Sequence, residues 1–246
     1  MPAQTSLGPT LLAVPYLRSP ADSLTRLRLP GDTVERHELV AQLVGAPGTL
    51  LDVGGVSGQL AAFLPGTSVT VINVNADGDL RYDGESLPFA GATFEVVTSL
   101  DVLEHVAPDR RENHLREALR VARRLLVSCC PVGTPEHVEN ERSSAAWYER
   151  MTGAPHPFLA EHLVLGLPTV AELERLAAAV GGELRFHGDF RRTDAAFRTA
   201  MLARHRPGPG TLWRYGRERL GRSTSSLELS SRAGPYANRA YISAGA

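Results

Sequence analysis

The stretch LDVGGVSGQL, residues 51–60, decides the fold of this chain. An apolar run over residues 49–53 leads directly into glycines at positions 54, 55 and 58, and residues 57–64 are expected to form a short helix. Glycine permits positive φ and lets a ligand approach the backbone closely, and a helix N-terminus offers unpaired N–H donors. The stretch therefore predicts a strand, a glycine turn and a helix. On its own it fits a ligand-binding loop and a tight strand-to-helix connection equally well.

The rest of the chain alternates between strand-like and helix-like segments. Apolar runs without alternation, such as LLVSCC at residues 125–130, are typical of strands buried on both faces. Strands that alternate with helices predict a parallel sheet covered on both sides, with ligands bound at the carboxyl ends of the strands. We expect strands near residues 49–53, 68–74, 79–82, 93–99, 124–130, 183–190 and 239–243, and helices near 32–44, 108–122, 169–180, 194–203 and 212–220.

Composition excludes several classes of function. The chain has 246 residues, 43% of them hydrophobic, and a formal net charge of −1, so neither nucleic acid nor a membrane surface is expected as a partner. It has no lysine, which excludes a lysine Schiff base and a Walker A lysine. Cys129 and Cys130 are adjacent and are expected to be buried, reduced thiols in a cytoplasmic protein. Residues 1–31 are broken by prolines and lack a leading positive cluster, so we interpret them as an N-terminal extension.

Two later segments add specificity to the glycine turn. YDGESLPF, residues 82–89, and FEVVTSLDVLEHV, residues 94–106, follow it in order and at compatible spacing. With these pieces the chain resembles class I S-adenosylmethionine-dependent methyltransferases that act on small molecules, over roughly residues 33–190. The resemblance implies a Rossmann-like, seven-stranded, mostly parallel sheet with helices on both faces, formed by residues 32–246. It also implies S-adenosylmethionine as the cofactor.

The resemblance further implies cofactor-binding residues on three loops. The glycine backbone would line the methionine end, and Asp52 would lie near the amino group of the cofactor, directly or through water. Asp83 would accept a hydrogen bond from the adenine amine, although an aspartate before glycine also suits an ordinary turn. The complete implied set is Asp52, Gly54, Gly55, Gly58, Asn73, Asp83, Gly84, Leu100, Asp101 and Val102.

Three departures from the family pattern concern this same pocket. Val56 stands where another glycine is usual, and only a short loop joins the second strand to the third, where the family has a helix. Asn73 replaces the acidic residue that accepts both ribose hydroxyls. Loss of a charge-assisted hydrogen bond would cost roughly 1–2 kcal/mol, or about tenfold in affinity.

The acceptor side is expected beyond the fourth and fifth strands. His105 is placed to act as a general base or to order its loop, and residues 131–168 form a long insertion that suits a helical substrate lid. We select His105, His137 and Tyr148 as candidate catalytic residues, with Trp147 beside Tyr148 as a candidate pocket wall. His137, Glu141 and His162 offer metal-ligand chemistry. HxxxE is nevertheless common on helices and no HExxH or cysteine set is present, so no metal is expected.

The sequence thus predicts an S-adenosylmethionine-dependent methyltransferase with a small-molecule substrate, in bacterial specialised metabolism. Two alternatives stay open. One is an enzyme of this fold that catalyses another, non-methylating reaction, and the other is a non-catalytic binding protein that retains the fold.

Overall fold

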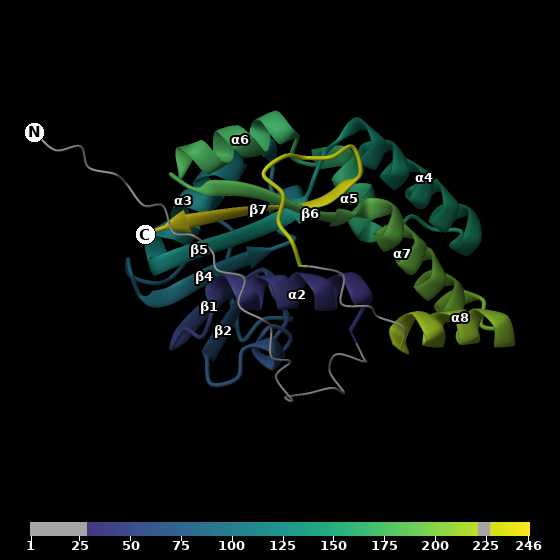
Figure 1. Cartoon of the computed structure of the whole chain (residues 1–246), viewed down its shortest axis with the longest axis horizontal. Helices are drawn as coiled ribbons and strands as arrows, with labels where there is room; N and C mark the ends of the chain where they lie inside the picture. Colours follow the sequence, from purple (N-terminus) through teal and green to yellow (C-terminus); the bar gives the residue numbers. More distant parts are fainter. Residues whose placement is uncertain (1–28, 221–226) are drawn as a thin grey trace, which may run out of the picture.

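The computed structural model describes residues 29–220 and 227–246, so most of the expected N-terminal extension lies outside the described residues. The chain forms a seven-stranded sheet with helices around it (Figure 1). The strands are β1 Thr49–Val53, β2 Ser68–Asn73, β3 Leu80–Arg81, β4 Phe94–Leu100, β5 Ala122–Pro131, β6 Glu183–Asp189 and β7 Ala237–Gly245. The α-helices are α2 Gly31–Val44, α3 Arg111–Val121, α4 Pro135–Thr152, α5 Pro157–Leu165, α6 Val170–Ala179, α7 Phe190–His205 and α8 Pro209–Leu220. Within the described ranges, three short 3-10 helices complete the elements: η1 Ala61–Phe63, η2 Leu103–His105 and η3 Pro108–Arg110.

The strand order is β3-β2-β1-β4-β5-β7-β6. Strands β1 to β5 pair in parallel, whereas β7 runs antiparallel to both β5 and β6. The expected mostly parallel, seven-stranded sheet is therefore confirmed. Because β1, β2, β4 and β5 are parallel, the loops that follow them meet at one edge of the sheet.

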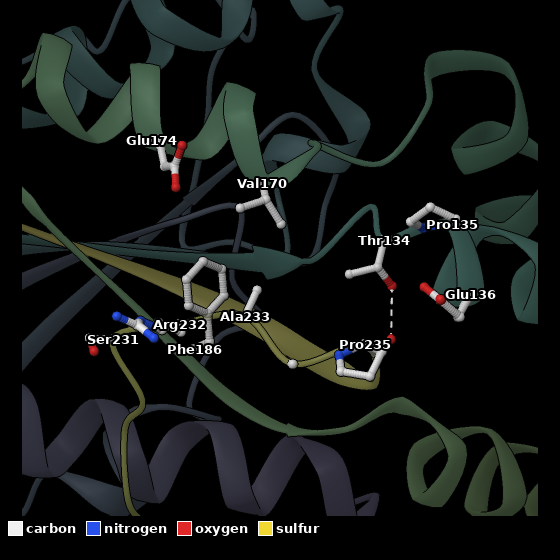
Figure 2. A pocket seen from close by; sticks show the side chains of 11 residues that line it. Thr134, Pro135, Glu136, Val170, Glu174, Phe186, Ser231, Arg232, Ala233 and Pro235 are labelled. Carbon is white, nitrogen blue, oxygen red and sulfur yellow. Dashed lines mark hydrogen bonds between the residues drawn. The ribbon is translucent and has the colours of Figure 1, made fainter.

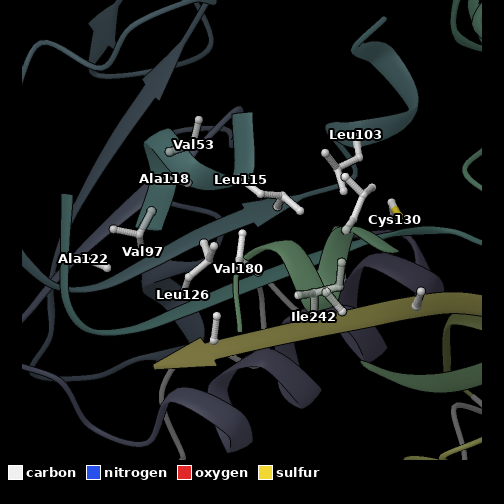
Figure 3. Packing of buried hydrophobic residues seen from close by; sticks show 14 of the residues in the cluster. Val53, Val97, Leu103, Leu115, Ala118, Ala122, Leu126, Cys130, Val180 and Ile242 are labelled. Atoms are coloured by element: carbon white, nitrogen blue, oxygen red, sulfur yellow. The ribbon is translucent and has the colours of Figure 1, made fainter. Parts of the chain in front are cut away.

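Two apolar cores, one on each face, hold the three layers together. Helices α3 and α6 cover one face, and α2 covers the other (Figure 1). Successive strand residues point to opposite faces, so Leu126 and Cys130 of β5 join the α3–α6 core while Val127 and Cys129 join the α2 core. Figure 3 shows the first of these cores, with Leu115 and Ala118 of α3 packed against strand residues. Both cysteines are buried free thiols, as expected.

One local expectation is wrong. Residues 57–64 form turns and the short η1 helix, because Gly58 adopts a φ of 79°, which an α-helix does not allow. Helix α2 begins at Gly31 without a side-chain cap. In its first turns, Asp32 lies 3.5 Å from Arg239 and Glu35 accepts a hydrogen bond from His187.

The insertion at residues 131–168 consists of α4 and α5. These helices gather with α7 at the end of the sheet where β5 terminates (Figure 1). Between β2 and β3, residues 74–79 form only bends and turns, so the expected loss of a helix there is confirmed. Among the described residues, no helix is both long and apolar enough to cross a bilayer.

Candidate active site

The glycine loop after β1 is held by close contacts with its neighbours. Gly54 has a φ of 81°, and a Cβ built there would lie 2.4 Å from Cγ2 of Val102. A Cβ on Gly55 would lie 2.0 Å from Oδ2 of Asp52. Gly58 also has positive φ, but its Cβ direction meets nothing within 4 Å. Glycine is therefore required at the first two positions by packing, while Gly58 faces open space.

Asp52 lies beneath this loop, at the end of β1. It is 1% exposed, and its Oδ1 accepts a hydrogen bond of 2.8 Å from the Thr98 hydroxyl. Burial raises the pKa of Asp52 to about 6, although the Thr98 hydrogen bond and the charge of Arg36 oppose the shift. A cation bound above the loop would stabilise the ionised carboxylate, which is the role implied by the resemblance.

Asn73 faces the protein interior. Its side-chain amide donates to the carbonyl oxygens of Gly54 (3.0 Å) and Gly55 (2.8 Å), and its Oδ1 accepts from the backbone N–H of Val74 at 2.7 Å. The resemblance implies that this side chain contacts the ribose hydroxyls. The structure instead engages both amide hydrogens in fixing the glycine loop, a task for which a carboxylate has no donor.

The loop after β2 adds a second attachment to the glycine loop. The backbone N–H of Ser57 donates to the Asp77 carbonyl at 2.8 Å, and its hydroxyl donates to Oδ1 of Asp79 at 2.6 Å. These bonds and the Asn73 amide tie the two loops directly together. Val56 and Val74 are exposed on them, at 39% and 50%.

The Asp83–Gly84 turn lies near the end of β2. Oδ1 of Asp83 accepts from the backbone N–H groups of Glu85 (2.8 Å) and Ser86 (3.2 Å), and these hydrogen bonds lower its pKa. Gly84 has a φ of 84°, and a Cβ there would lie 3.2 Å from Cγ1 of Val74. The aspartate thus stabilises its own turn, with an exposed carboxylate beside the end of β2.

The segment after β4 is strained and tightly held. Leu100 is buried in the α2 core, and Asp101 has a φ of 53°, unusual for a residue other than glycine. Arg239 of β7 donates to both Asp101 carboxylate oxygens, at 3.0 and 2.8 Å, and Arg36 of α2 also pairs with this carboxylate. The Asp101 side chain is therefore occupied, so only the backbone of this segment is free to run along a cofactor. Val102 covers Gly54.

His105 belongs to a chain of hydrogen-bonded side chains over the same edge. Its Nδ1 lies 2.7 Å from Oε2 of Glu161, and its Nε2 lies 3.3 Å from Nε2 of His162. His162 continues to Glu141 through a 3.1 Å contact at its own Nδ1. Desolvation lowers the pKa of His105, with the Glu161 hydrogen bond opposing the shift. Neutral imidazole at this position has the proton affinity a general base needs.

The other two candidate catalytic residues lie apart from His105. His137 is buried at the start of α4, where its ring stacks on Phe190 at 4.5 Å and its Nδ1 contacts the Val132 carbonyl at 2.9 Å. Tyr148 packs between α4 and α7 against Phe197, His156 and His205. Both sets of contacts are those of residues that order the insertion. Trp147 packs against the same Phe197.

Sequence reasoning missed Arg111, the largest fully buried side chain among the described residues. Its Nε donates to the carbonyls of Leu103 (3.0 Å) and Val106 (3.1 Å), and its Nη1 pairs with the Glu172 carboxylate. It also donates to the Gly166 carbonyl. Because Leu103 and Val106 flank His105, Arg111 fixes the segment that contains this histidine. An arginine in an amphipathic helix gives no sequence signal of such burial.

A cavity of about 360 Å³ lies at the β6–β7 end of the sheet, away from the glycine loop. Figure 2 shows Phe186, Val170 and Thr134 around it, with the Thr134 hydroxyl donating to the Pro235 carbonyl at 3.2 Å. None of the residues selected from the sequence lines this cavity. The candidate active site is therefore the loop cluster at the carboxyl ends of β1, β2, β3 and β4.

Comparison with known proteins agrees with this geometry. Residues 51–125, which contain the glycine loop, the Asp83 turn and the His105 segment, match the family model described as a methyltransferase domain. The match is to this part of the chain, and the strand order of the whole sheet is that of the Rossmann-like fold typical of methyltransferases.

Some solved structures are similar to this chain at low sequence identity. The plantazolicin methyltransferase BpumL, bound to S-adenosylhomocysteine and a triazolic desmethylPZN analogue, is 11% identical and has a TM-score of 0.53; the match covers 91% of this chain and 89% of BpumL. The [4+2]-cyclase SpnF is 19% identical with a TM-score of 0.47, over 86% of this chain and 80% of SpnF. No curated protein sequence matches the chain.

The described residues fit the implied cofactor at two of its three parts. The glycine backbone and buried Asp52 suit a cationic amino-acid end, and the exposed Asp83 carboxylate suits an adenine amine. The ribose end differs, because Asn73 is hydrogen-bonded within the protein. Ribose contacts would instead come from the exposed loop at residues 74–77.

Proposed function

We propose that this protein transfers a methyl group from S-adenosylmethionine to a small molecule, in bacterial specialised metabolism and in the cytoplasm. The observation that supports the proposal best is the meeting of three loops, at Gly54, Asp83 and Asp101, on one edge of a sheet with the methyltransferase strand order. The shared fold of BpumL, which is a methyltransferase bound to S-adenosylhomocysteine, adds support for the cofactor.

Gly54, Gly55, Gly58 and Asp52 would hold the methionine end, and Asp83 with Gly84 would hold the adenine. Bound S-adenosylmethionine supplies a methyl group on a sulfonium, which is already activated for attack. The protein therefore contributes mainly alignment of the acceptor. His105 adds a base for an acceptor that must lose a proton, and Glu161 holds its Nδ1 so that Nε2 presents a lone pair. His137 and Tyr148 remain candidates that would act through the shape of the insertion.

The experiment measures formation of S-adenosylhomocysteine by the purified protein, with a panel of small hydroxyl, amine and carboxylate acceptors. We expect turnover with at least one acceptor, a product heavier by one methylene, and a large loss of kcat in His105→Gln for a hydroxyl acceptor. His187→Gln is the matched control, because His187 also pairs with a glutamate but lies on β6.

One observation favours an enzyme of this fold that no longer methylates. The internal hydrogen bonds of Asn73 and Ser57 join the two loops between which a ribose would bind. Binding of S-adenosylmethionine without methyl transfer to any acceptor in the panel would support this second function. Failure to bind either S-adenosylmethionine or S-adenosylhomocysteine at millimolar concentration would refute both, and would leave a non-catalytic binding protein.

A further inference from the structure

The side chains of Glu104, His105 and His162 converge on one point next to the candidate active site. One carboxylate oxygen of Glu104 and one ring nitrogen of each histidine all lie within 4.8 Å of one another. Glu104 and His105 come from η2, after β4, and His162 comes from α5 of the insertion, which packs against η2. The cluster therefore depends on the packing of α5 against the segment after β4.

One carboxylate oxygen of Glu104 is buried without a hydrogen-bond partner among the described residues. The residue is 1% exposed, and the oxygen is Oε2. A buried carboxylate is costly unless it is paired or coordinates a metal. None of the arginines that fix the neighbouring backbone donates to it, since Arg111 is directed to carbonyls and Glu172. A cation within the cluster would satisfy this oxygen.

The two histidines are oriented as metal ligands usually are. Each Nδ1 faces a carboxylate, Glu161 at 2.7 Å for His105 and Glu141 at 3.1 Å for His162. An ionised carboxylate only accepts hydrogen bonds, so each Nδ1 carries the proton and each Nε2 presents a lone pair. Metal-bound histidines almost always have such a carboxylate or carbonyl partner on the other nitrogen.

The distance between the two Nε2 atoms also fits a shared ion. It is 3.3 Å, and with metal–nitrogen bonds of about 2.1 Å, two imidazoles at neighbouring octahedral or tetrahedral positions are roughly 3.0–3.4 Å apart. Without an ion, the two lone pairs face each other unless one ring carries an extra proton.

We propose that Glu104, His105 and His162 bind a divalent first-row transition metal ion, with Glu141 and Glu161 orienting the histidines. Two imidazoles favour zinc, iron, cobalt or nickel over magnesium and calcium, which prefer oxygen ligands. Three protein ligands leave at least one position open for an oxygen atom. Resting on the proposed function, this position suits a methyl acceptor that offers an oxygen donor. With the ion bound, Nε2 of His105 would hold the ion instead of serving as the base, and the ion would lower the pKa of an acceptor hydroxyl.

The test uses the full chain, stripped with a chelator and titrated with Co²⁺ and Zn²⁺ by calorimetry and visible absorption. We expect one tight equivalent, Co²⁺ absorption bands typical of nitrogen and oxygen ligands, and no competition from millimolar Mg²⁺. Glu104→Gln and His162→Gln should abolish the tight equivalent, and the more exposed Glu161→Gln should weaken it about 10–100-fold without disturbing the fold. His187→Gln should bind as the original protein does.

Two results would overturn the proposal: no tight equivalent in the stripped protein, or an equivalent that survives in both Glu104→Gln and His162→Gln. The melting temperature of each variant without metal shows that it is folded. Because no cofactor or acceptor is present in these titrations, failure of the metal site is distinguishable from failure of the proposed methyl transfer.

Discussion

Replacing Asn73 by aspartate restores the acidic residue of the family pattern, yet the structure predicts that the change is harmful. The Asn73 amide donates to the carbonyls of Gly54 and Gly55 at 3.0 and 2.8 Å and is 8% exposed. An aspartate would remove both donors and place a negative charge against two carbonyl oxygens. Two lost hydrogen bonds at about 1 kcal/mol each, with the unmet carbonyls and the repulsion, give a loss of about 2–4 kcal/mol in the free energy of unfolding.

Urea unfolding followed by circular dichroism measures this loss. Asn75→Asp is the matched control, because Asn75 is exposed and its Oδ1 accepts from the Asp77 N–H, which a carboxylate also does. We expect a change within about 0.5 kcal/mol for the control. The deficit of Asn73→Asp should shrink at low pH, where a protonated carboxyl regains one donor. If Asn73→Asp were as stable as the original protein and bound S-adenosylhomocysteine more tightly, our description of Asn73 would be wrong.

Three further predictions concern groups around the same loop. Burial raises the pKa of Asp52 from 3.8 to about 6, so the contribution of this group to stability is present below about pH 4 and lost as the pH rises through about 6. The loss in the free energy of unfolding should reach up to about 3 kcal/mol. Thermal melts across this pH range should show it in the original protein and not in Asp52→Asn. Gly54→Ala should lower the free energy of unfolding by about 2–4 kcal/mol, because the new Cβ would clash with Val102. Gly58→Ala should lower it by only about 1–2 kcal/mol, because its positive φ is the sole source of strain. Equal losses for the two variants in urea unfolding would contradict this contrast. Arg239→Met should lower the free energy of unfolding in urea by about 3–5 kcal/mol, because it leaves the Asp101 carboxylate paired with Arg36 alone. A smaller loss would show that Arg36 is enough to neutralise this carboxylate.

The sequence allowed prediction of the sheet and of the loops that carry the candidate site, because both depend on local patterns. Apolar runs define the strands, and the glycines within residues 51–60 indicate the turn that follows the first strand. The prediction of a helix at residues 57–64 was wrong because Gly58 adopts positive φ, which periodicity does not reveal.

The finer geometry of the site depends on contacts between distant residues, and it was not predictable from sequence. Asp101 meets an arginine 138 positions away, and His105 meets a histidine 57 positions away. Asn73 occupies the family's ribose position, but the direction of its side chain is set by the carbonyls of a loop on the neighbouring strand. The residues were therefore found by pattern, whereas their roles depend on partners that only the folded chain brings together.

The central claim is that the loops after β1, β2, β3 and β4 bind S-adenosylmethionine, and calorimetric titration with S-adenosylhomocysteine tests it most directly. Saturable binding of one equivalent is expected, which Gly54→Ala and Asp83→Ala weaken and His187→Gln, on β6, leaves unchanged. Absence of binding at millimolar ligand, or binding that Gly54→Ala and Asp83→Ala leave intact, would contradict it.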